Sequence, residues 1–174
     1  MKIFISFILL FSVSLTAKEL DKKESEFVKK EISSMLLLFN KGDGKALLEK
    51  THHSMHKLLG GKEKFEEMMT KVVKTVMDTG IKFESVKVGE PSKLYQAGDE
   101  EVCFVPKESI LSMQGRRFKS INYMIAIRSL DTKKWSYLDG SGLKNNKDLL
   151  WQLLPKLTKD VELPPNTTEE LKSN

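Results

Sequence analysis

The spacing of apolar residues along the first half of the chain predicts three helices. Between residues 22 and 40 the apolar positions recur every three or four residues, which is the pattern of a helix with one buried stripe. The same spacing predicts helices over about 45–59 and 62–79. Glycine follows each of these segments, as is usual at helix C-termini.

From residue 81 the pattern changes to the alternation of a β-sheet. Strands are expected at residues 81–88, 93–96, 101–113, 118–128 and 135–138. A slip in the alternation at Ser85 predicts a bulge, Pro106 is expected to interrupt the third strand, and Gln114-Gly115 predicts a hairpin turn. Consecutive strands joined by short turns favour an antiparallel meander.

The order of elements, helices first and strands second, predicts an α+β fold with helices on one side of the sheet. A further amphipathic helix is expected at 146–154. The domain would cover residues 18–158, and the polar segment 159–174 is expected to be a frayed tail.

Residues 1–17 have the parts of an export signal peptide. Lys2 gives the positive start, 3–15 is almost purely apolar, and Ala17 is the small residue before a charged segment. The apolar run is shorter than the about 20 residues that cross a bilayer. The alternative is a retained anchor or a core helix, because Leu15 is bulky for its place before the cut. We expect an exported protein, in a bacterial periplasm or secreted.

Removal of the signal peptide leaves a small positive net charge. Loss of Lys2 from the 29 basic residues leaves 28 against 24 acidic ones, a net charge of +4. Basic and acidic residues alternate, so they predict a solvated surface and no nucleic-acid partner. No later segment is apolar enough to span a membrane. Cys103, the single cysteine, lies in an apolar run and is expected to be buried and inert; the alternative is a reactive thiol.

Two short segments carry a resemblance to a known family. Residues 39–43 (Phe-Asn-Lys-Gly-Asp) end the first helix, and residues 134–140 (Lys-Trp-Ser-Tyr-Leu-Asp-Gly) close the meander. With this element order, residues 22–142 resemble the nuclear transport factor 2-like superfamily, which includes SnoaL-like polyketide cyclases and ketosteroid isomerase. The resemblance implies a strongly bent, cone-shaped sheet, with a cavity used for catalysis, ligand binding or dimer contacts. The helix at 146–154 departs from the family pattern.

All three histidines lie together in the second expected helix. His52 and His56 would be one turn apart, with His53 beside them and Glu49 one turn earlier. Two imidazoles at this spacing can hold zinc, but a stable site needs further ligands. The sequence favours the alternative, a polar helix face without a metal, and no cofactor is expected.

The candidate catalytic residues are Asp139, at the end of the last strand, with Tyr123 and Tyr137 as hydrogen-bond donors. They do not form a recognisable set of acid, base and oxyanion donor. Aromatic residues at strand spacing are usually core residues, which favours a packing role for the two tyrosines.

The sequence therefore favours a non-enzymatic domain that binds a small apolar ligand or a protein partner, as a monomer or homodimer. One alternative is a cofactor-free lyase or isomerase that acts inside the cavity. The other is a structural accessory of the cell envelope, in which the last helix plugs the cone or docks on a partner.

The signal-peptide hypothesis predicts a shortened protein. Mass spectrometry of protein purified from its own compartment should give the mass of residues 18–174. A mass that includes residues 1–17 would indicate the retained anchor instead.

Overall fold

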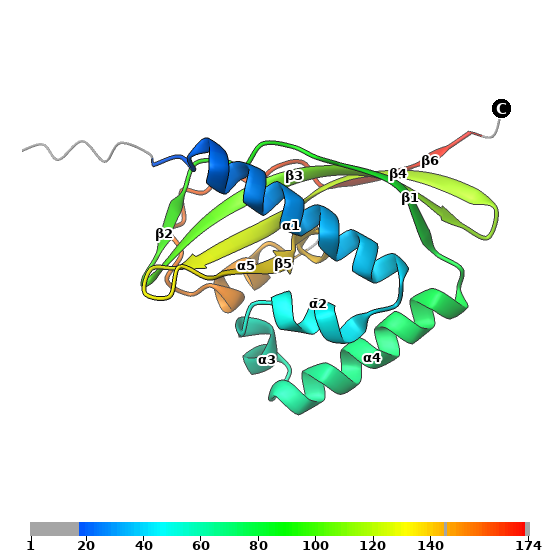
Figure 1. Cartoon of the computed structure of the whole chain (residues 1–174), viewed down its shortest axis with the longest axis horizontal. Coiled ribbons are helices and arrows are strands. Elements are labelled where there is room, and N and C mark those ends of the chain that lie inside the picture. Colours follow the sequence, from blue (N-terminus) through cyan, green and yellow to red (C-terminus); the bar gives the residue numbers. More distant parts are fainter. Residues whose placement is uncertain (1–17, 145, 173–174) are drawn as a thin grey trace, which may run out of the picture.

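Between residues 18 and 80 the structure has one more helix than expected. A computed structural model of the chain describes residues 18–144 and 146–172, so the expected signal at 1–17 lies outside the described residues. The described helices before the sheet are α1 (Lys22–Asn40), α2 (Gly44–Lys50), α3 (Ser54–Leu58) and α4 (Lys62–Asp78) (Figure 1). The first and last agree with the expected helices.

The single helix expected over 45–59 is wrong, because the chain breaks at Thr51. Thr51 is extended and forms a parallel bridge with Tyr137, and the amide of His52 donates to the Tyr137 carbonyl at 3.0 Å. Tyr137 lies in an edge strand, whose backbone groups need partners. This tertiary pairing outweighs the local helical pattern and separates α2 from α3.

The sheet is antiparallel, curled and open, which confirms the α+β fold class. Its strands are β1 (Lys82–Val88), β2 (Tyr95–Ala97), β3 (Glu100–Met113), β4 (Arg116–Ser129), β5 (Trp135–Asp139) and β6 (Thr167–Leu171). The order is β1-β3-β4-β5, with β2 paired to β3 and β6 paired to β4. The bulge expected at Ser85 is confirmed by a register shift between Phe83 and Ser85.

Pro106 does not interrupt β3, contrary to expectation. Residue 106 pairs with Tyr123 of β4, and its carbonyl accepts from the Gly89 amide at 2.8 Å, just after β1 ends. The nitrogen and carbonyl of a strand residue point to the same side, so the missing N–H of Pro106 faces Gly89, just past the end of β1, and the pairing of β3 with β4 loses no hydrogen bond. At the C-terminal end of β3 the expected turn is confirmed, with φ of 51° at Gln114 and 76° at Gly115.

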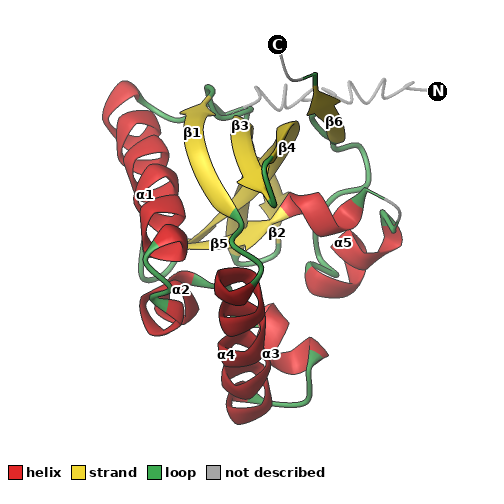
Figure 2. Ribbon diagram, turned by 90° about the vertical axis from the view of Figure 1, so that its right-hand side faces the viewer, coloured by secondary structure: helices red, strands yellow, loops and turns green. Residues whose placement is uncertain are grey.

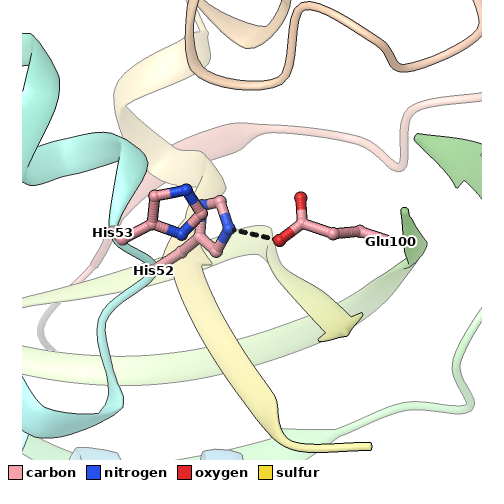
Figure 3. Close-up of side chains that lie close together, drawn as sticks. All are labelled: His52, His53 and Glu100. Carbon is pink, nitrogen blue, oxygen red and sulfur yellow. Dashed lines mark hydrogen bonds and ion pairs between the residues drawn. The ribbon is translucent and has the colours of Figure 1, made fainter. Parts of the chain in front are cut away.

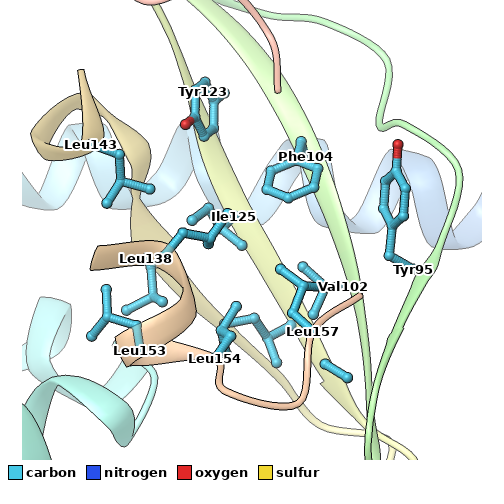
Figure 4. Packing of buried hydrophobic residues seen from close by; sticks show 13 residues of the cluster. Tyr95, Val102, Phe104, Tyr123, Ile125, Leu138, Leu143, Leu153, Leu154 and Leu157 are labelled. Carbon is cyan, nitrogen blue, oxygen red and sulfur yellow. The ribbon is translucent and has the colours of Figure 1, made fainter. Parts of the chain in front are cut away.

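Helices cover both faces of the sheet, which corrects the expectation that they lie on one side (Figure 2). Val28 and Ile32 of α1 pack on the face that carries Cys103. On the opposite face the short helix α5 (Asp148–Leu153), which follows the 3-10 helix η1 (Gly140–Leu143), and the segment after it form a second core (Figure 4). The thiol of Cys103 is buried as expected, and burial raises its pKa to about 12.

The C-terminal segment is not frayed over residues 167–171. These residues form β6, which pairs with residues 117–121 of β4. Arg116 anchors this strand through Nε, which donates to Glu170 Oε1 at 2.6 Å. The strand is polar and exposed, so apolar periodicity gave no signal for it. Within residues 18–144 and 146–172, no helix has both the length and the apolarity needed to cross a membrane.

A buried ion cluster joins α1 to the sheet. Arg128 of β4 donates to Glu101 of β3 from Nε at 3.0 Å and from Nη2 at 2.5 Å, and it also pairs with Glu24 of α1. Lys18 donates to the other oxygen of Glu101 at 3.0 Å. Burial raises the pKa of Glu101, but the Lys18 and Arg128 contacts outweigh it, so the net pKa is lowered.

Glu101→Gln should therefore lower the free energy of unfolding by about 2 kcal/mol at pH 7, since it weakens charged hydrogen bonds to a buried arginine. A lowered folded-state pKa gives stability that is complete above the ordinary value of 4.5 and is lost as the pH falls through the folded-state pKa. Urea unfolding from pH 3 to 7 should show the deficit of the variant shrinking below pH 4.5.

Glu67→Gln is the matched control. Glu67 pairs with Lys71 on the exposed surface of α4, where an ion pair contributes little. A deficit for Glu101→Gln that is unchanged at low pH would contradict the assigned role of the ion cluster.

Candidate functional site

An apolar cavity of about 480 Å³ lies beside the edge strand β5, among α1, α2, α4 and the η1–α5 segment. Its wall is built from residues of α1 to α5 and η1, and from residues of β1, β4 and β5. The apolar lining includes Ile32, Met35, Leu36, Phe39, Leu47, Met55, Phe65, Met69, Phe83, Met124, Ile125, Leu138, Leu143, Leu149 and Leu153. We refer to it as the apolar cavity.

Two of the three candidate catalytic residues line this cavity. Asp139 and Tyr137 belong to its wall, together with Thr51 and Ser141. Tyr123 does not line it; its ring packs edge-on against Phe104, with centroids 5.8 Å apart, in the core under α5. Burial raises the pKa of Tyr137 above its ordinary value, with further contributions from Glu31 and Cys103, so its hydroxyl stays protonated.

Asp139 is held in place by two contacts. Its Oδ2 accepts from Nζ of the buried Lys107 at 3.1 Å, and its Oδ1 accepts from the Ser141 amide at 2.8 Å. Burial raises the pKa of Asp139, but Lys107 and Ser141 outweigh it and the net pKa is lowered. The group is therefore an ionised carboxylate at neutral pH, suited to accept hydrogen bonds and a poor proton donor.

Two of the three histidines, His52 and His53, line a second pocket, also of about 480 Å³, which we call the polar pocket. Nε2 of the buried His52 lies 3.0 Å from Oε1 of Glu100, and Nδ1 lies 2.8 Å from the Ser54 hydroxyl (Figure 3). The rings of His52 and His53 have centroids 4.2 Å apart. Burial lowers the pKa of His52, which the contact with Glu100 only partly offsets.

The grouping of the histidines differs from the expected one. His56 packs on the ring of Phe65, with centroids 5.0 Å apart, and is not among the ligating groups that cluster with His52. The carboxylate in the cluster is Glu100, 48 residues from His52, and not Glu49. The sequence carries no signal for this contact, because it depends on how the loop after α2 meets the start of β3.

The loop after α2 separates the two sites. Thr51 and Met55 face the apolar cavity, while His52 to Ser54 face the polar pocket. Leu153 of α5 lines both, so the two sites share this residue in their walls.

Comparison of the chain with protein-family models, with curated proteins and with solved structures gives no match. The resemblance to the nuclear transport factor 2-like superfamily therefore stays a prediction.

The ion pair between Asp139 and Lys107 predicts how variants of these two residues change the free energy of unfolding. Asp139→Asn should lower the free energy of unfolding by about 2 kcal/mol, because it leaves Lys107 buried without a counter-charge. The loss should be smaller than for a fully buried pair, since the Asp139 side chain is half-exposed.

The double variant Asp139→Asn/Lys107→Met should recover most of this loss in urea unfolding, because it removes the buried charge as well. A double variant that is less stable than Asp139→Asn alone would contradict this account.

Proposed function

We propose that the protein binds a small apolar ligand in the apolar cavity. The observation that carries the proposal is the cavity itself: its volume of about 480 Å³ and its almost wholly aliphatic, aromatic and methionine lining. Pockets for small molecules are typically roughly 300–1,000 Å³ and mainly apolar, with a few polar groups that orient the ligand. The export signal expected at the N-terminus would place this binding outside the cytoplasm.

The polar atoms of the wall suggest the kind of ligand. Asp139 and Ser141 are close in sequence and both line the cavity, next to an otherwise apolar surface. The carboxylate of Asp139 is ionised and half-exposed, so it retains free acceptor capacity beside its contacts with Lys107 and Ser141. A ligand with an apolar body and one hydroxyl or amino donor fits this distribution better than an anionic one.

A cofactor-free lyase or isomerase has less support. Such an enzyme needs a base and a second proton-transfer or hydrogen-bonding group around one substrate. The only ionisable carboxylate among the described lining residues, Asp139, has a lowered pKa, which weakens it as a base. His52 and His53 line the polar pocket on the other side of the loop after α2.

A protein partner on the sheet face also has less support than a small ligand. α1 packs on one face of β3 and β4, and α5 with the segment after it packs on the other. The chain itself thus covers both faces of the sheet over the central strands.

Ligand binding predicts that an apolar fluorescent probe enters the cavity. N-phenyl-1-naphthylamine should bind with a blue shift and enhanced emission, and Met69→Trp should weaken this binding at least about tenfold, or 1.4 kcal/mol. Met69 lines the cavity from α4, and the larger indole would occupy part of its volume.

Met77→Trp is the matched control, because Met77 lies on the same helix with an exposed side chain and does not line the cavity. No probe binding by the parent protein, or equal loss in both variants, would overturn the proposal. Circular dichroism would verify that both variants are folded.

A further inference from the structure

We propose that His52, His53 and Glu100 form a binding site for a divalent transition-metal ion such as Zn²⁺. One ring nitrogen from each histidine and one carboxylate oxygen all lie within 4.8 Å of one another (Figure 3). Two imidazoles and one carboxylate are a donor set that zinc uses when three protein ligands leave one coordination position open. This proposal does not rest on the proposed binding of a ligand in the apolar cavity.

The distances suit a small ion after minor side-chain adjustment. Bonds of roughly 2.1 Å in a tetrahedral site place the donor atoms about 3.4 Å apart. His52 Nε2 and Glu100 Oε1 are already 3.0 Å apart, so an ion can replace the hydrogen bond between them with little movement. His53 is exposed, so a rotation of its side chain would bring its ring nitrogen the remaining distance.

His52 is held in an orientation that favours metal binding. Its Nδ1 lies 2.8 Å from the hydroxyl of the buried Ser54 and accepts from the Ser54 amide at 3.4 Å, which leaves Nε2 directed at Glu100. An ion on Nε2 requires the ring proton on Nδ1, where the Ser54 hydroxyl can accept it. Its backbone is fixed by the hydrogen bond from its amide to Tyr137. Histidines that bind metals usually hold their second ring nitrogen in such a contact, which fixes the ring and its tautomer.

The surroundings of the three ligands are compatible with a bound cation. The polar pocket carries two lysines, Lys57 and Lys156, and two carboxylates, Asp99 and Glu100, so its charges balance before an ion enters. Lys156 is paired with Asp99 at 3.5 Å and not with Glu100. The open coordination position would face this pocket, where water or a small anion could complete the shell.

Zn²⁺ titration of the purified protein by calorimetry tests the site. We expect one ion per chain, and we expect His53→Ala and Glu100→Gln each to raise the Kd at least about tenfold, the smallest loss typical for disrupting a metal site. His53 is exposed and Glu100→Gln preserves shape, so both variants should fold. Co²⁺ in place of Zn²⁺ should give the intense visible absorption of a four-coordinate site.

His56→Ala and Asp99→Asn are the matched controls, a neighbouring histidine and a neighbouring carboxylate outside the donor set; each should leave the Kd within about twofold of the parent. Absence of Zn²⁺ binding overturns the proposal. So does a loss in only one of His53→Ala and Glu100→Gln, or an equal loss in the controls, because the three residues would then not act together.

Discussion

The bridge between Thr51 and Tyr137 is the contact on which both sites depend. β5 is the last strand in the order β1-β3-β4-β5, and its outer edge needs hydrogen-bond partners. The chain supplies them by leaving the helical conformation at Thr51 and directing the His52 amide to the Tyr137 carbonyl. As a result, Thr51 and Met55 line the apolar cavity, whereas His52 to Ser54 line the polar pocket. A continuous helix would have put His52 and His56 on one face and left β5 uncovered.

The two faces of the sheet differ in the kinds of residue that they bury. The face under α5 is almost wholly apolar, whereas the face under α1 also buries polar residues, among them Lys107 and Arg128. Each of these cations has a carboxylate partner, Asp139 and Glu101 respectively. Buried ion pairs add little net stability, but they are costly to break, so they favour one register of strands over its alternatives.

The sequence predicted what depends on local periodicity. The 3.6-residue spacing of α1 and α4, the alternation along β4 and the hairpin turn at Gln114-Gly115 are encoded within short windows, and the structure agrees with all of them. The helix break at Thr51 and the strand β6 were missed, because each depends on pairing with a distant strand. Of the candidate catalytic residues, Asp139 and Tyr137 line the apolar cavity, and their catalytic role stays a prediction. Neither the contact of Glu100 with His52 nor the separation of the histidines has a signal in the sequence, because both depend on long-range contacts.

The position of Leu153 in the wall of both the apolar cavity and the polar pocket has a thermodynamic consequence. A ligand that displaces this side chain on entering one site changes the shape of the other. Any resulting coupling free energy must be reciprocal: a ligand that weakens or strengthens ion binding is itself weakened or strengthened by the same factor. Two chemically unlike compartments, one apolar and one polar, would in that way respond to each other through a single leucine.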